Sequence, residues 1–304
     1  MVHILRRGLH SLVALFVLLL LVFFLARLTG DPTNLYLPLE APLEVREAFA
    51  QQHGFNDPLY KQFFSYLADL ARLDFGDSLF QGRPAMDAAM QAFPVTLALA
   101  SITMMIAVVL AVLIGSLAAY RPGKLFDRLA SMLTILSASA PDFWIALVAI
   151  LVLSVQLDLL PTSGMGTVWH WLLPVGVLLI RPLGLLAQVA RAEMIDALNA
   201  NFVKTARAKG ASKKRVVFVH SLRNALPSIV MVAGDQTVSM INGAVIVETI
   251  FGWPGIGNLM IGAIIQRDFA VVQACILVTA VAIFVMNILL DFIHTRLDPR
   301  VLPR

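Results

Sequence analysis

The sequence has few charged residues for its length. Only 14% of its 304 positions are Asp, Glu, Lys or Arg, whereas 59% are apolar. A water-soluble domain has about 25% charged residues, because its surface must be wetted. The mean hydropathy of +0.82 points the same way. This composition excludes a soluble globular protein, and the length leaves little room for a soluble catalytic domain beside a membrane domain.

The chain also lacks the motifs of the common catalytic and cofactor sites. Its single cysteine, Cys275, has no disulfide partner and is expected to be a packing residue. No G-x-x-x-x-G-K-[ST] loop is present, so ATP is not bound by that device. No histidines, cysteines and carboxylates are spaced as metal ligands, and no Ser or Cys lies in a nucleophile motif. We therefore expect no catalytic residue, cofactor or metal in this chain, and an energy source in an ion gradient or another protein.

What the sequence does have is long apolar runs. A helix needs about 20 mostly apolar residues to cross the hydrocarbon of a bilayer. Arg6 and Arg7 precede the first run as they would in a signal peptide, but no small-residue cleavage site follows and five further runs do, which favours a retained anchor. The prediction is an all-α polytopic membrane protein with six spans, at about residues 9–28, 95–120, 129–157, 172–190, 226–247 and 270–292.

The basic residues set the orientation. With the N-terminus inside, the inner segments hold sixteen of the 23 Lys and Arg residues, the outer segments hold six, and Arg181 lies within a span. Since cytoplasmic segments carry the excess of Lys and Arg, both termini are predicted to be cytoplasmic. The net charge of +4 then reflects topology and requires no nucleic-acid surface.

This topology divides the chain into four parts. Residues 1–28 form the first span, 29–93 an external segment, 94–295 the main transmembrane domain and 296–304 a cytoplasmic tail. The external segment is acidic, and its pattern predicts helices at 43–53 and around 63–70. We interpret it as a small helical cap over the bundle, which is compatible with a second role in docking an external partner. His53 is expected to be an exposed residue at a helix end.

The longest cytoplasmic segment, 191–225, reads as two helices around a glycine. Apolar residues from Met194 to Ala206 recur every three or four positions, Gly210 interrupts them, and Ser212 can cap a second helix that ends before Pro227 opens the next span. One apolar face and many basic residues are compatible with a hairpin anchored to anionic lipid. They are equally compatible with a hairpin that docks into a partner protein.

Two ionisable residues lie deep within predicted spans. Arg181 in the fourth span and Asp235 in the fifth both lie about 13–15 Å from the cytoplasmic face, at 1.5 Å per residue. An unpaired charge there costs about 2.5–3.5 kcal/mol by insertion scales. We therefore predict an ion pair, or a close approach through water, beside the substrate path. The alternative is that Pro182 kinks the fourth span and Arg181 alone faces a water-filled cavity.

Residues 251–257 are rich in glycine and aromatic residues and are followed by a short apolar run, 259–265. This pattern predicts either a short re-entrant or interfacial helix that lines an external gate, with Trp253 at the headgroup level, or an ordinary turn.

Five motifs, in order along nearly the whole chain, resemble one known family. They are Gly-Asp-Pro at 30–32, Asp74 to Ser78 with Phe93-Pro94-Val95-Thr96, the run from Asn201 to Pro227, Glu248 to Gly257, and Leu-Asp-Pro-Arg at 297–300. The sequence is identified by these motifs as a member of the dipeptide/oligopeptide/nickel family of ABC-importer permeases. Its external segment resembles that of the B-type member of a permease pair. Lys204 and Thr205 stand where the general coupling motif has Glu and Ala, although the peptide branch shows this T-A-R-A-K-G form.

The resemblance implies a type I importer permease fold in a bacterial inner membrane, and a non-catalytic role. It implies a second, paralogous permease, two cytoplasmic ATPase subunits that bind ATP and Mg, and an external solute-binding protein. ATPase closure on ATP would switch the access of the path from inward to outward. The implied ATPase-coupling residues are Phe202, Val203, Thr205, Ala206, Ala208 and Gly210, and the external gate comprises Glu248, Phe251, Trp253, Pro254, Gly255 and Gly257.

Two other classes of function have weaker support in the sequence. A secondary transporter or channel working without an ATPase would be expected to carry ionisable groups in several spans and internal repeats. Only Asp142, Arg181 and Asp235 meet the first expectation, and we find no repeat. A membrane enzyme has no catalytic constellation to support it. Cargo is not specified, and peptides, nickel chelates, glutathione and opine-like compounds all fit.

Overall fold

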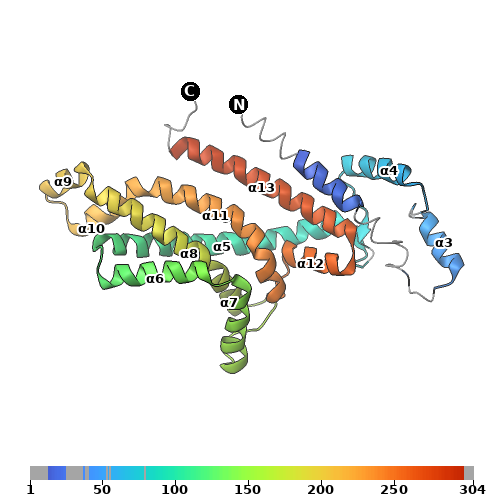
Figure 1. Cartoon of the computed structure of the whole chain (residues 1–304), viewed down its shortest axis with the longest axis horizontal. Coiled ribbons are helices and arrows are strands. Elements are labelled where there is room, and N and C mark those ends of the chain that lie inside the picture. The colour runs from blue at the N-terminus through green and yellow to red at the C-terminus, as the bar shows by residue number, and fades with distance from the viewer. Residues whose placement is uncertain are drawn as a thin grey trace. The chain divides into compact units, whose positions relative to one another are not determined.

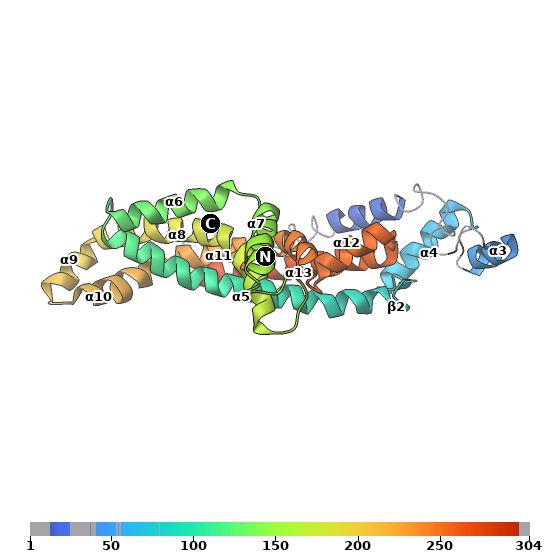
Figure 2. The same cartoon turned by 90° about the horizontal axis from the view of Figure 1, so that it is seen from below.

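The computed structural model describes residues 13–24, 37, 41–52, 54, 56–78 and 80–297, and in this part of the chain nearly all regular structure is helical (Figures 1 and 2). The side chains of residues 138 and 294–297 are not described. The Gly-Asp-Pro motif at 30–32, His53 and the tail at 298–304 lie outside the described residues, as do both ends of the first predicted span.

Four of the described helices are long and apolar enough to cross a membrane. They are α5 (Ala85–Tyr120), α8 (Val168–Asn199), the continuous helix Lys213–Ile250, and α13 (Phe269–Leu297). A fifth span is counted if α6 (Leu125–Ser139) forms one bent span with α7 (Asp142–Ala149) and the π-helix η1 (Ile150–Gln156). The predicted span at 9–28 is described as a shorter apolar helix, Val13–Phe24. The structure thus shows a multi-pass helical protein with four or five long spans.

The third predicted span, at 129–157, is not one continuous helix. The axes of its two parts differ in direction by 102°, and Figure 1 shows α7 leaving the direction of α6. The break falls at Ala140, which has an extended backbone with ψ of 133°, directly before Pro141. Proline has no N–H to continue a helix and pushes the residue before it out of the helical region. The Ala-Pro step at 140–141 was the available sequence signal.

Pro227 does not begin the fifth span as predicted. The helix is already continuous from α10 (Lys213–Arg215) through the π-helix η2 (Val216–Ser221) into α11 (Leu222–Ile250), and Pro227 lies inside α11. A proline costs a helix one backbone hydrogen bond, but in lipid any other structure would leave many more backbone groups unsatisfied. The helix therefore continues through Pro227.

One compact unit comprises residues 1–95 and 255–285. It contains helix Val13–Phe24, α3 (Leu43–Gln52), α4 (Leu59–Ala71) and α12 (Ile256–Gln266), so both helices predicted in the external segment are present. Two strands of two residues each, β1 (Asp77–Ser78) and β2 (Arg83–Pro84), pair antiparallel as a hairpin, with Ser78 opposite Arg83. The core of this unit consists mainly of small side chains from the start of α5, from α12 and from α13.

The second unit comprises residues 96–254 and 286–304. Here α8 lies between α6 and α11 and contacts both (Figures 1 and 2). The start of α8 is fixed by a capping box, in which Thr167 and His170 satisfy each other's backbone N–H groups. Glycines allow close helix crossings, as is common in membrane helices. A Cβ on Gly184 would collide with Ser137 of α6, and one on Gly115 would lie 2.6 Å from the Cβ of Ala190.

Candidate functional site

The predicted helix–glycine–helix hairpin is present. The first helix is α9 (Asn201–Ala208), and it contacts α8 and η2. Val203 is fully buried and anchors α9 to the rest of this unit, whereas Phe202, Thr205 and Ala208 are exposed. Ala206 is half-buried. The buried face of α9 therefore packs on α8 and η2, and its opposite face, which includes the Phe202 ring, is exposed.

The turn of the hairpin is built from two specific caps. Gly210 has a φ of +80°, and the hydrogen bonds from Ala211 N to Ala206 O and from Gly210 N to Arg207 O form a Schellman motif. Two residues later the Ser212 hydroxyl accepts a hydrogen bond from Arg215 N at 3.4 Å, as an N-cap does. No atom lies within 4 Å of a Cβ built on Gly210, so its backbone conformation is what requires glycine within this chain.

A buried ion pair that sequence analysis did not predict lies near the same end of α8. The Arg191 guanidinium makes two hydrogen bonds to the Asp127 carboxylate, the second from Nη2 to Oδ2 at 2.8 Å. Asp127 is buried and also accepts a hydrogen bond from Gly123 N at 2.7 Å. Bidentate arginine–carboxylate pairs have strongly preferred geometry. This pair fixes the turn between α5 and α6 to the part of α8 that leads to the hairpin.

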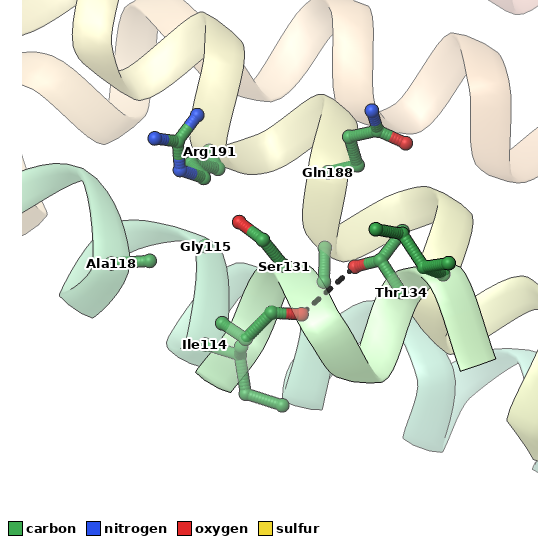
Figure 3. A pocket seen from close by; sticks show the side chains of 10 residues that line it. Ile114, Gly115, Ala118, Ser131, Thr134, Gln188 and Arg191 are labelled. Carbon is green, nitrogen blue, oxygen red and sulfur yellow. Dashed lines mark hydrogen bonds between the residues drawn. The ribbon is translucent and has the colours of Figure 1, made fainter. Parts of the chain in front are cut away.

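A cavity of about 130 Å³ adjoins this ion pair (Figure 3). It lies between α5, α6 and α8, and its polar lining comes from Ser131, Thr134, Gln188 and Arg191. The Thr134 hydroxyl is already used, because it donates to the Ala130 carbonyl in its own helix at 3.0 Å. The cavity is too small for a peptide, and its lining is mainly apolar with a few polar side chains from two of the three helices.

Three large side chains at the C-terminal end of α11 and directly after it are buried. Glu248 is fully buried and accepts a hydrogen bond from the Thr96 hydroxyl at 2.5 Å. Phe251 and Trp253 are also buried, and the Phe251 carbonyl accepts from Gly164 N at 2.8 Å. Trp253 packs edge-on against Trp171, with 4.7 Å between the ring centroids. In this unit Glu248, Phe251 and Trp253 thus form a packed end to α11, while Pro254 is exposed.

The short apolar helix predicted after these residues is present as α12 (Ile256–Gln266), with Gly255 as its N-cap and Gly257 buried. It ends in a Schellman motif in which Arg267 has a φ of +56°. The next residue, Asp268, is buried and accepts a hydrogen bond from the Ser78 hydroxyl at 2.5 Å. The start of α13 is thereby joined to the β1–β2 hairpin, a contact that no local pattern predicts. A gating role for α12 remains a prediction.

The structure does not form the predicted Arg181–Asp235 ion pair. Among the described residues the ion pairs within 4.0 Å join Lys61 to Asp57 and Arg191 to Asp127. Arg181 and Asp235 both lie on exposed faces of their helices, and α8 continues through Pro182. Equal depth in the bilayer was therefore insufficient as an argument for pairing, because depth does not fix the direction in which a helix turns a side chain.

The fold defines the class first: this is a multi-pass helical membrane protein. Similar folds occur in an amino acid ABC transporter (TM-score 0.55, 19% identity, 69% of this chain and 94% of that chain). They occur also in the MetNI methionine ABC transporter in an inward-facing form (TM-score 0.59, 16% identity, 70% and 97%).

Sequence comparison then gives the family. Residues 111–303 match the family described as binding-protein-dependent transport system inner membrane component. The chain is 34% identical to the oligopeptide transport system permease protein AppB of Bacillus subtilis, over 98% of both chains. It is equally similar to the glutathione transport system permease protein GsiC of Escherichia coli K12, again over 98% of both. The chain belongs to this family and is a permease of the ABC-importer type, as the sequence motifs predicted.

Proposed function

We propose that this chain forms one half of the path by which an ATP-driven importer moves a peptide or a related small solute across a bacterial inner membrane. Glutathione, nickel chelates and opine-like compounds belong to the same solute class. The other half would be a second, paralogous permease, with two ATPase subunits inside and a solute-binding protein outside. AppB and GsiC, which are named for oligopeptide and glutathione transport, support this range of cargo.

The observation that carries the proposal is the geometry of α9. Phe202, Thr205 and Ala208 are exposed while Val203 holds the helix from behind, and Gly210 and Ser212 fix the turn. A short helix presented in this way fits a groove on another protein better than a lipid surface, where its aromatic ring would lie beside the polar Thr205, its i+3 neighbour. ATP and Mg would be bound by the ATPase subunits, and this chain would transmit their closure through the hairpin.

The deciding experiment is reconstitution. The permease is purified with its ATPase subunits, and uptake into proteoliposomes is measured with ATP, without ATP, and with an ion gradient alone. We expect co-purification and uptake that requires ATP and the external binding protein. Uptake driven by the gradient without an ATPase would instead support a secondary transporter, with Asp142, Arg181 and Asp235 as the candidate ion-coupling groups. Ligand binding to the cognate binding protein would then identify the cargo.

A further inference from the structure

One face of α4 packs on the first apolar helix. The rings of Tyr66 and Phe23 stack with centroids 4.8 Å apart, and those of Phe63 and Phe24 stack at 5.9 Å. The Tyr66 hydroxyl donates to the Leu19 carbonyl at 3.4 Å. Burial raises the pKa of Tyr66 to about 12, and the neutral hydroxyl is the form that donates this hydrogen bond. The contact is specific, and it positions α4 along the side of helix Val13–Phe24.

A second face of α4 is apolar and uncovered. Tyr60 is 68% exposed and Phe64 is 66% exposed, and Ala68 and Ala71 lie on the same side of the helix. At 3.6 residues per turn the polar residues occupy the remaining arc. That arc consists of Lys61, Gln62, Ser65 and Asp69. The apolar surface of α4 is thus wider than the part that packs on helix Val13–Phe24. The remaining part requires a second apolar environment.

The position of α4 indicates which environment this is. Leu19 lies five residues, or about 7 Å along the helix, inside the described end of Val13–Phe24. The exposed side chains of this helix, among them Val17 and Leu21, must face acyl chains if it is part of a span. Phe24 belongs to that exposed surface, Phe63 stacks on it, and Phe64 lies 5.8 Å from Phe63. The lipid-facing surface of the span therefore continues without interruption onto α4.

We propose that α4 is an interfacial helix of the outer leaflet, with Tyr60 and Phe64 among the upper acyl chains and the Lys61–Ser65–Asp69 edge in water. The Lys61–Asp57 ion pair, 2.9 Å long and exposed, lies on this polar edge, where its charges remain hydrated. Aromatic side chains are favoured at this level of a bilayer. The external segment is then more than a cap in the aqueous phase, because one of its helices is held in the membrane beside the first span.

Two adjacent positions test the proposal. Phe64→Cys and Ser65→Cys are made separately in the full chain on a Cys275→Ala background, and each is labelled with a nitroxide in vesicles of phosphatidylethanolamine and phosphatidylglycerol. Collision with oxygen, which concentrates in lipid, is compared with collision with a water-soluble nickel chelate. We expect the label at 64 to favour oxygen, as a Val17→Cys reference should, and the label at 65 to favour nickel, as a Glu44→Cys reference should.

Equal access of nickel to both labels would overturn the proposal and place α4 in water. Protection of the label at 64 only after a soluble binding protein is added would overturn it in favour of a protein-docking face. If the cysteine variants fold poorly, Phe64→Asp and Ser65→Asp replace them without labelling. We expect Phe64→Asp to reduce the amount of protein in the membrane several-fold and Ser65→Asp to leave it unchanged, and equal effects would contradict the assignment.

Discussion

Gly210 has a φ of +80°, a backbone conformation that residues other than glycine rarely adopt. A β-branched residue there costs about 1–2 kcal/mol, which the short hairpin can relieve only by changing its turn. We therefore predict that Gly210→Val leaves insertion intact but abolishes ATP-dependent uptake, whereas Gly210→Asn, which tolerates this conformation, retains most of it. The measurements are membrane abundance, ATPase co-purification and uptake.

Gly82 supplies the matched control for this prediction. It has a φ of +62° and, like Gly210, no atom within 4 Å of a built Cβ, but it lies in the hairpin between β1 and β2. Gly82→Val imposes the same kind of strain away from the coupling hairpin, so it should preserve uptake. Normal uptake by Gly210→Val, or equal loss in both variants, would show that the turn at 210 has no particular part in coupling.

The Asp127–Arg191 pair should show strong energetic coupling. Breaking a buried pair by removing one partner costs about 3–5 kcal/mol, and the lower end applies because the Arg191 side chain is 31% exposed. We predict that Asp127→Leu and Arg191→Met each lower the free energy of unfolding in detergent, and that the double mutant loses much less than the sum. Additive losses would mean that the pair is not formed in the folded protein.

The same cycle on Arg181 and Asp235 provides the contrast. Since these side chains form no ion pair among the described residues, Arg181→Met and Asp235→Leu should give defects in uptake that add. If the double mutant instead takes up more solute than either single mutant, the ion pair predicted from sequence must form in another state of the transporter.

These pairs show which side-chain contacts sequence can reveal. Gly210 and Ser212 were identified as a turn and a cap, because each acts on backbone groups within a few residues. Asp127–Arg191, Thr96–Glu248 and Ser78–Asp268 join residues 64, 152 and 190 positions apart, and only the packing of whole helices brings them together. The motifs flagged Ser78, Thr96 and Glu248 as members of a family pattern but did not indicate their partners.

At the scale of elements, the crossing of α5 and α8 depends on Gly115. A Cβ there would lie 2.8 Å from the backbone N of Arg191 and 2.9 Å from the carbonyl of Ala187, and backbone atoms cannot move aside as a flexible side chain can. We predict that Gly115→Ala lowers the melting temperature of the purified protein. Gly176→Ala in α8, where nothing lies within 4 Å, should maintain or raise it, because alanine is the better helix former. The reverse order would contradict this crossing geometry.

The packed end of α11 depends on the volume of Trp253 and not on its polar atom. Trp253 is fully buried, and its indole N–H has no acceptor among the described residues. Trp253→Ala should cost about 3–5 kcal/mol of unfolding free energy, as large-to-small changes in cores do. Trp253→Phe keeps a ring against Trp171 and should cost far less. A large loss in both variants would reveal an acceptor for the indole N–H.

At the scale of the whole molecule, the orientation of the chain is open to a direct test. Sixteen of the 23 basic residues lie in segments predicted to be cytoplasmic, eight of them between 191 and 225. We predict that a fluorescent protein fused after Arg304 is fluorescent, and that alkaline phosphatase inserted after Asn56 is active outside. An inactive phosphatase at Asn56 with a fluorescent C-terminal fusion would mean an even number of spans between these sites, in place of the five predicted.

The span count shows the limit of composition as a guide. Apolar runs located α5, α8, α11 and α13 correctly, because hydropathy responds to length and charge alone. It did not resolve the third run into α6 and α7, since both halves are apolar and only the Ala-Pro step at 140–141 separates them. The family motifs supplied what hydropathy lacks, the family to which the permease belongs.

The length of α8 and the place where it contacts α6 have a mechanical consequence. Its 32 residues extend about 48 Å, well beyond a hydrocarbon thickness of about 30 Å, and its last residues lead directly to α9. A close approach to α6, at Gly184 against Ser137, falls almost at its midpoint. A rod with its fulcrum at the centre has arms of equal length and a mechanical advantage near one. A displacement of the hairpin by a few ångströms would therefore appear at Val168 with similar size and in the opposite direction.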